Sequence, residues 1–144
     1  MKNTFLLHLK MDTDLILQTK IMGQNKNSQI YNHLRDFPIF SIGQFSSVQS
    51  NFSKAITWQI VGERQLSGFN QIVKLCQSIE QHFKTVRHRF YIQAIYQSGL
   101  YVMIQSKTYF PDTNMATRIA TCEVYAVDAL NQLIQIQFYC ISIQ

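Results

Sequence analysis

Hydrophobic residues recur with two different periods along this chain, and the period changes once. In the first part, apolar side chains return every three or four residues, which is typical of helices that bury one face. Beyond about residue 86 they alternate with polar residues, which is typical of strands. Helices followed by a run of strands indicate an α+β domain, with the helices packed on one face of an antiparallel sheet.

The helical pattern predicts three main helices, over 12–22, 28–37 and 68–83, and a short helix over 39–45 after Pro38. The strongest of these is 68–83, because its apolar residues form a single stripe. The stripe consists of Phe69, Ile72, Val73, Cys76, Ile79 and Phe83. A polar loop over 46–54 and a short strand over 55–60, centred on Trp58, separate the short helix from this last one.

Four segments rich in β-branched and aromatic residues predict strands, over 87–97, 100–110, 117–128 and 133–143. Short connections such as Ser98-Gly99 separate them, so we expect an antiparallel meander.

The register of the last two strands determines which side chains share a face. If Asp128 pairs with Leu133, Glu123 lies on the apolar face of the sheet. The last strand contributes to that face Ile134, Ile136, Phe138 and Cys140. Cys122 and Cys140 then lie on opposite faces, which argues against a disulfide between them.

A carboxyl in an apolar pocket has a raised pKa, because burial disfavours its charged form, and it can then donate a proton or a hydrogen bond. Glu123 is therefore the candidate acid. A strand glutamate is also commonly exposed or paired with a cation, and the sequence leaves both interpretations open.

Composition limits the class of protein. With 144 residues, of which 47% are hydrophobic and 15% charged, the chain has enough apolar material for one core. Because an apolar segment that could span a membrane is missing from the sequence, we expect no membrane partner. We expect a single domain over 12–144, preceded by an extension over 1–11.

The net charge of +5 would permit binding to nucleic acid. The basic residues are mostly scattered singly, however, with one cluster at Arg87-His88-Arg89, so we expect a solvated basic surface and no nucleic-acid partner.

Candidate metal ligands and nucleophiles are few. The three cysteines lack the spacing of a zinc site, and we expect a reducing, cytoplasmic location with no metal and no cofactor. His82 and His88 are expected to be solvated or hydrogen-bonded rather than metal ligands.

Several short segments, in their order and spacing, resemble the nuclear transport factor 2-like superfamily, in particular its SnoaL-like branch and the ketosteroid isomerases. They are Gln29-Ile30-Tyr31, Ile56-Thr57-Trp58 followed by Gly62, Leu66-Ser67-Gly68, the run from Cys122 to Asp128, Leu133-Ile134 and Phe138-Tyr139. The resemblance implies a cone-shaped, strongly curved antiparallel sheet wrapped on about three N-terminal helices. It also implies an internal apolar pocket and a homodimer that forms through the outer face of the sheet.

The same resemblance places Glu123 where the isomerases have their oxyanion-hole acid. At the position of their general base this chain has Gln59 and Ile60, which cannot abstract a proton. The leading hypothesis is therefore a domain that binds a small apolar or aromatic molecule. The expected ligand-binding residues are Trp58, Thr121, Tyr125, Ile136, Phe138 and Cys140.

Two alternatives remain. One is an isomerase, lyase or cyclase-like enzyme with Glu123 as its acid and Tyr125 or Thr121 positioning the substrate. The other is a protein-interaction module, which would need an exposed apolar patch that the sequence does not reveal.

Overall fold

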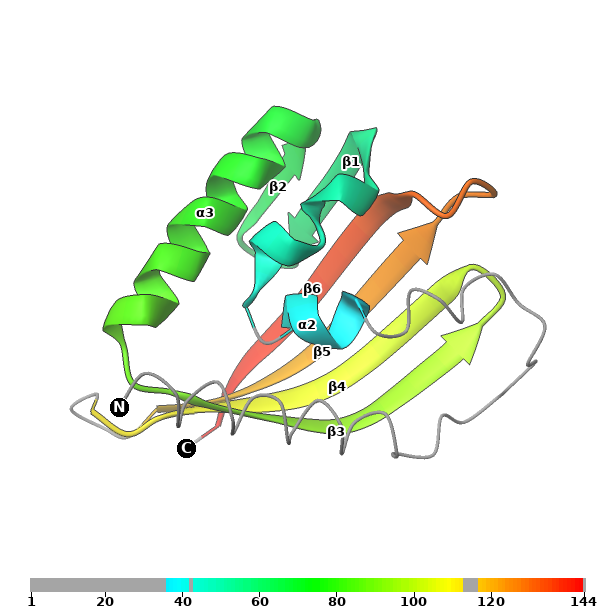
Figure 1. The fold of residues 1–144 in the computed structure, drawn as a ribbon. Coiled ribbons are helices and arrows are strands. Elements are labelled where there is room, and N and C mark those ends of the chain that lie inside the picture. The colour runs from blue at the N-terminus through cyan, green and yellow to red at the C-terminus, as the bar shows by residue number, and fades with distance from the viewer. Residues whose placement is uncertain (1–35, 42, 113–116, 144) are drawn as a thin grey trace.

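The computed structural model describes residues 36–41, 43–112 and 117–143, and these form an α+β fold as predicted (Figure 1). The helical elements are α2 (Asp36–Ser41), the 3-10 turns η2 (Phe45–Ser47) and η3 (Gln49–Asn51), and α3 (Phe69–Thr85). The strands are β1 (Phe52–Ile60), β2 (Arg64–Ser67), β3 (Arg89–Ser98), β4 (Tyr101–Phe110), β5 (Thr117–Val127) and β6 (Leu133–Ile143). Neither of the two described α-helices is long and apolar enough to cross a membrane.

The six strands form one curled, open sheet in the order β2-β1-β6-β5-β4-β3. From β3 to β6 it is the antiparallel meander that alternation predicted. The expectation of an antiparallel sheet throughout is wrong, because β1 lies parallel to β6. A tight turn cannot join two parallel strands, and here the chain passes through β2, α3 and the whole meander between them.

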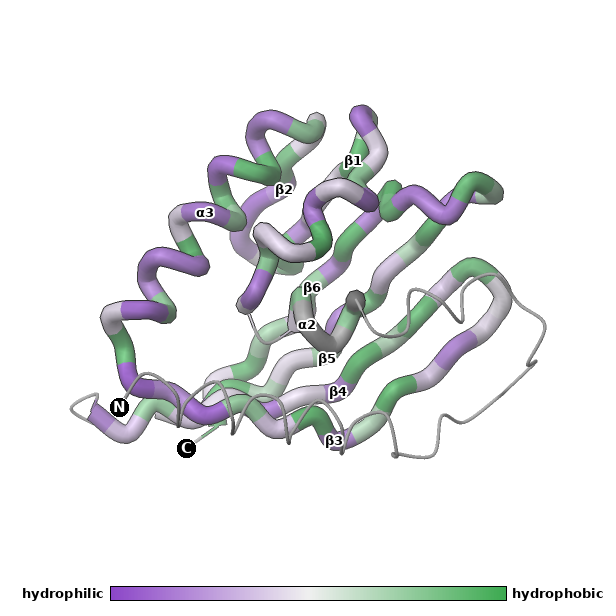
Figure 2. The backbone as a smooth tube through the Cα atoms, in the orientation of Figure 1, coloured by the Kyte–Doolittle hydropathy of each residue, from purple (hydrophilic) through white to green (hydrophobic). Residues whose placement is uncertain are grey.

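Helix α3 covers β1 and β2 on the concave face of the sheet (Figure 1). Ile72 and Cys76 are fully buried, and hydrophilic and hydrophobic residues alternate along the helix, as expected of one buried face (Figure 2). The helix begins after Gly68, whose φ of +91° suits glycine. Its observed range agrees with the predicted 68–83 to within two residues.

Strand β2 was not foreseen. Its four residues form a hairpin with β1 through Gly62, and they lie at the edge of the sheet, largely exposed. A short polar edge strand carries little hydrophobic pattern, so strand alternation does not predict it.

The core of the concave face is an aromatic cluster around Phe40, which α2 supplies. The ring of Phe40 lies with its centroid 4.5–6.2 Å from five others, which are Phe45, Phe52, Trp58, Tyr125 and Phe138. Contacts at these separations and at steep angles are the favoured arrangement of aromatic rings.

The predicted helix over 12–22, and the one over 28–37 up to residue 35, lie outside the described residues, so the expected three helices stay a prediction. The short helix expected over 39–45 is matched only in part, because α2 begins earlier, at Asp36, and ends at Ser41, and η2 begins at Phe45. The expected internal pocket is not confirmed, since the rings of Phe37 and Phe40 occupy the concave face where it was placed.

Candidate functional site

Glu123 lies in the middle of β5, between Ile104 on β4 and Phe138 on β6. It is 2% exposed, so its carboxyl faces the core as the predicted register required. A bulge between Ala126 and Val127 shifts the pairing nearer the turn. The prediction that Ile134 lies on the apolar face with Glu123 is therefore wrong: its side chain is exposed.

Tyr125 is the hydrogen-bond partner of this carboxyl. Its hydroxyl donates to Oε2 of Glu123, and its ring is completely buried. The two residues are two positions apart on one strand, so alternation places both on the same face. The ring of Phe37 stacks on Tyr125 with centroids 4.8 Å apart and planes 11° apart.

Burial raises the pKa of Glu123 from 4.5 to about 7, and the hydrogen bond from Tyr125, followed by the nearby Ser41 hydroxyl, lowers it by less. In the part of the chain that the structure describes, no basic side chain forms an ion pair with this carboxyl. The alternative of an exposed or cation-paired Glu123 is therefore wrong for the described residues. The carboxyl holds a proton in slightly acidic solution and loses it in slightly alkaline solution.

Two further polar atoms are buried in the concave face without a hydrogen-bond partner among the described residues. They are Oγ of Ser41 and Nε1 of Trp58. Although Ser41 lies close enough to influence the pKa of Glu123, its oxygen lies outside hydrogen-bonding geometry. A buried polar group without a partner costs about 1–3 kcal/mol. Sequence reasoning missed Ser41, because the approach of α2 to β5 has no local signal.

The structure brings most of the expected ligand-binding residues together around Glu123. Trp58, Tyr125 and Ile136 are fully buried, and Phe138 packs on Trp58 with ring centroids 4.9 Å apart. Thr121 and Cys140 form the next cross-strand pair, and Cys140 is exposed. These two residues therefore lie at the solvent side of the cluster.

The other candidate groups are not assembled into a site. All three cysteines are free, and burial raises the pKa of Cys76 to about 12, so its thiol stays protonated. His88 Nδ1 lies 2.7 Å from the carbonyl oxygen of Val86. Within the described ranges, no three His, Cys, Asp or Glu side chains gather as a metal-ligand set.

Gln59 occupies the position where the resemblance would place a general base. Its Oε1 accepts a hydrogen bond of 3.4 Å from Nε2 of Gln137 on the neighbouring strand. An amide cannot take a proton at neutral pH, so this position supplies no base.

No protein-family model matches this sequence, and no curated protein sequence matches it. Solved structures do match. A nuclear transport factor 2-like protein of unknown function from Cytophaga hutchinsonii has a TM-score of 0.70 at 21% identity, over 79% of this chain and 100% of its own. The fold is nuclear transport factor 2-like.

Other structures with this fold are named for a reaction. A candidate SnoaL-like polyketide cyclase from Shewanella putrefaciens has a TM-score of 0.61 at 12% identity, over 82% of this chain and 83% of its own. An epoxide hydrolase from M. tuberculosis, like the LEH type, has a TM-score of 0.55 at 14% identity, over 72% of this chain and 75% of its own. The nuclear transport factor 2-like fold thus supports different reactions, and the function must be argued from the site.

Proposed function

We propose that the concave face binds a small, mainly apolar molecule with one oxygen acceptor, to which Glu123 donates a hydrogen bond. One observation carries this proposal: a buried carboxyl with a pKa of about 7 lies beside the hydroxyls of Tyr125 and Ser41, in an aromatic cluster. Below that pH the carboxyl is mostly protonated, and a protonated carboxyl in an apolar site is a strong hydrogen-bond donor.

The ring of Phe37 indicates the shape of a ligand that fits. It stacks flat on Tyr125, and a flat ring of similar size could take its place. Such a ligand has to displace Phe37, and this cost lowers its affinity. Phe37→Ala removes the competing ring, and apolar cavities of about this size are known to bind benzene-sized molecules.

The test compares acetophenone with ethylbenzene, which has nearly the same shape but no carbonyl oxygen. Trp58 is the single tryptophan of the chain, so quenching of its fluorescence reports binding near the cluster, and calorimetry gives the affinity. We expect Phe37→Ala to bind acetophenone more tightly than ethylbenzene below pH 7. The preference should disappear well above pH 7, where Glu123 is ionised.

Two variants in the Phe37→Ala background complete this experiment. Glu123→Leu should abolish the preference for acetophenone at every pH, whereas Arg118→Gln, far from the cluster on the outer face, should leave it unchanged. Equal affinity for the two probes at all pH values, or an unchanged preference in Glu123→Leu, would contradict the proposal.

A catalytic use of the same carboxyl is the second proposal, and the pKa near neutrality favours it. Glu123 would give its proton to the acetophenone oxygen while water removes a methyl proton, which forms the enol. The reverse steps in D₂O place deuterium in the methyl group, and NMR follows this exchange. If the protein accelerates this exchange and Glu123→Gln removes the acceleration, catalysis is supported. If the exchange is no faster than in buffer alone, the catalytic proposal is wrong and only the binding proposal stands.

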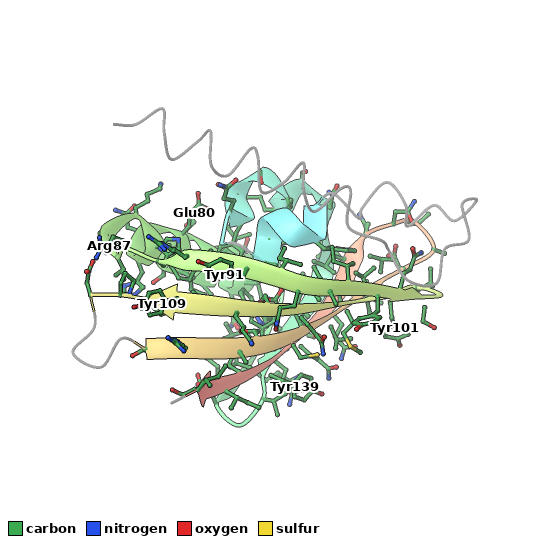
Figure 3. All side chains as sticks on the ribbon, turned by 90° about the horizontal axis from the view of Figure 1, so that it is seen from below. Glu80, Arg87, Tyr91, Tyr101, Tyr109 and Tyr139 are labelled. Carbon is green, nitrogen blue, oxygen red and sulfur yellow. The ribbon has the colours of Figure 1, made fainter. Side chains whose placement is uncertain are left out.

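We also propose a homodimer through the part of the outer face nearest the β3–β4 turn. Tyr96, Tyr101 and Met103 are exposed there, and Tyr139 is exposed farther along the same face on β6 (Figure 3 labels Tyr101 and Tyr139). We call these four side chains, each 38–55% exposed, the neutral patch. Because these side chains are uncharged, a copy related by a two-fold axis brings no like charges together. The exposure of Tyr96, Tyr101 and Met103 supports this use of the outer face.

Sedimentation equilibrium tests the dimer. Met103→Asp should weaken self-association at least tenfold, because it places a carboxylate from each copy in the interface. Leu130→Asp changes the charge equally in the β5–β6 turn and should have no effect. A wild-type protein that is monomeric up to millimolar concentration would contradict the homodimer.

A further inference from the structure

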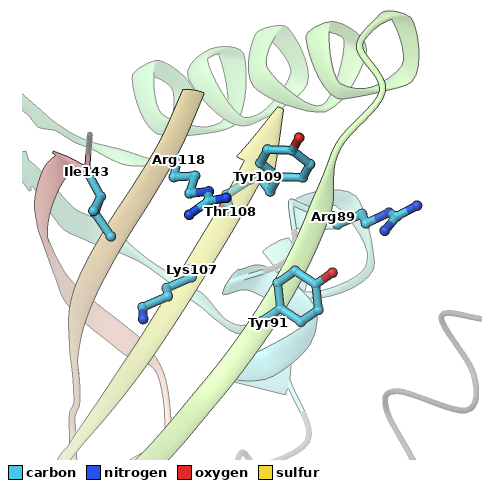
Figure 4. Close-up of a pocket in the computed structure, with 7 residues that line it drawn as sticks. All are labelled: Arg89, Tyr91, Lys107, Thr108, Tyr109, Arg118 and Ile143. Atoms are coloured by element: carbon cyan, nitrogen blue, oxygen red, sulfur yellow. The ribbon is translucent and has the colours of Figure 1, made fainter. Parts of the chain in front are cut away.

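The outer face of the sheet has a second region, at the opposite end of the same strands. Pairing aligns Arg89 on β3 with Tyr109 on β4, and Tyr109 with Arg118 on β5. In the next row, Tyr91 pairs with Lys107. Alternation sends these side chains to the outer face, and together they line a groove of about 380 Å³ (Figure 4). We call it the basic groove; its lining includes Arg89, Tyr91, Lys107, Tyr109, Arg118 and Ile143.

The three cations of the basic groove have no carboxylate to neutralise them among the described residues. Arg87 provides the contrast: its guanidinium forms a bidentate pair with Asp112, with a shortest distance of 2.6 Å. No such ion pair is formed by Arg89, Lys107 or Arg118 within the described ranges. Like charges on neighbouring strands repel one another, so an anion in the groove would relieve the repulsion.

Two tyrosines add flat surfaces beside these charges. The guanidinium of Arg118 lies 5.7 Å from the centre of the Tyr109 ring, within the range of a cation–π contact that holds it in position. Tyr91, on β3, is 52% exposed, and its ring lies between Arg89 and Lys107 (Figure 4). The groove therefore combines a fixed positive charge with an aromatic surface on which another ring can stack.

We propose that the basic groove binds a small anionic molecule that carries a phosphate beside a flat ring, of the class of a nucleoside monophosphate. The phosphate would lie between Lys107 and Arg118, because the guanidinium of Arg89 points away from these two across β3 (Figure 4), and the ring would pack on Tyr91. The volume of the groove is within the range of known small-molecule sites. This site is on the other side of the sheet from Glu123 and does not depend on the function proposed there.

A long nucleic-acid strand suits this face less well. It needs cations at regular intervals, since each bound phosphate contributes separately to its affinity. Beyond Lys107 the outward positions of β4 are Gln105, Met103 and Tyr101, which carry no charge. The positive charge is confined to one end, as a single phosphate requires.

The test measures binding of adenosine monophosphate by calorimetry at low ionic strength, with adenosine and inorganic phosphate as partial probes. We expect the monophosphate to bind at least tenfold more tightly than either part. Lys107→Gln and Arg118→Gln should each weaken it about tenfold, the loss expected for a charge-assisted hydrogen bond. Tyr91→Ala should reduce affinity for the monophosphate but not for inorganic phosphate.

Lys74→Gln is the matched control, because it removes the same charge from an exposed position on α3. It should leave the affinity unchanged, and exposed substitutions of this kind should leave the thermal midpoint of every variant near that of the wild type. Equal losses in Lys74→Gln and Lys107→Gln would show a general effect of net charge and overturn the proposal. So would a monophosphate that binds no better than inorganic phosphate, or a single-stranded oligonucleotide that binds far more tightly than the monophosphate.

Discussion

Each face of this sheet has ionisable side chains without a partner of opposite charge among the described residues. On the concave face the side chain is buried, and on the outer face the side chains are exposed. On the concave face, Glu123 is buried without a cation among the described residues. On the outer face, Lys107 and Arg118 lie in water without an anion among them. The buried charge can disappear by taking up a proton, whereas the exposed charges persist and are screened by salt. Burial therefore favours the neutral, proton-carrying form of the Glu123 carboxyl, whereas the exposed cations stay charged and attract anions.

Two tyrosines differ in burial in the same way, one on each face of the sheet. Tyr125 is completely buried and gives its hydroxyl to Glu123, whereas Tyr139, opposite Cys122 on the other face, is 43% exposed. In the sequence the two residues look alike, and only strand alternation separates them.

The largest expected difference between the faces is in packing. Phe40→Ala should lower the free energy of unfolding by about 3–5 kcal/mol, because the removed ring contacts five others in the core. Tyr91→Ala on the outer face should change it by less than about 1 kcal/mol. Urea denaturation followed by Trp58 fluorescence measures both, and similar losses would contradict the assignment of the two faces.

The next effect is the pH dependence that Glu123 causes. Its pKa in the folded protein, about 7, is above the 4.5 of the unfolded chain, so the folded state holds the proton more tightly. The contribution of Glu123 to stability is therefore full below about pH 4.5 and is lost as the pH rises to about 7, by about 3 kcal/mol in all. Glu123→Gln should remove this fall, while the exposed Glu63→Gln should keep it. Parallel curves for Glu123→Gln and the wild type would contradict the raised pKa.

A smaller effect isolates the hydrogen bond inside the concave face. Tyr125→Phe removes the hydroxyl that donates to Glu123 and lowers the pKa of its carboxyl. The pKa of Glu123 should therefore rise further, and the protein should lose about 1–2 kcal/mol of stability at pH 8. Titration of the labelled carboxyl carbon by NMR measures the shift. A fall in the pKa would show that the hydroxyl does not stabilise the carboxylate.

The smallest effect is on the outer face. Lys107→Gln should raise the stability by a few tenths of a kcal/mol, roughly 0.3, at low salt, because it relieves repulsion among the three cations. The gain should vanish at about 1 M salt, where charges are screened within about 3 Å. Chemical denaturation at the two salt concentrations checks it, with Lys74→Gln as the control.

The sequence predicted what alternation and short turns determine. The pairing of Glu123 with Phe138 followed from the length of the last turn, and the helix over α3 followed from its apolar stripe. The bulge at Ala126 and the parallel β1–β6 pair could not be predicted, because each depends on packing between segments far apart in the chain.

The two sets of polar residues that the sequence reasoning missed differ in kind. The position of Ser41 near Glu123 is a tertiary contact with no local signal. The basic groove does have a signal in the sequence: Arg89 belongs to the cluster Arg87-His88-Arg89, and Lys107 and Arg118 stand apart from it along the chain, but strand alternation places all three on one face of three adjacent strands.

The place of β6 between β1 and β5 has a consequence for the order in which the protein can fold during synthesis. Strand β6, which leaves the ribosome after the other five strands of this sheet, joins the β1–β2 hairpin to the strands β3–β5. Until residues 133–143 emerge, the two parts of the sheet have no strand in common, and the edges of β1 and β5 remain without their partner. Such late, non-local pairing slows folding and exposes strand edges that can aggregate, so the nascent chain should depend on chaperones until β6 is available.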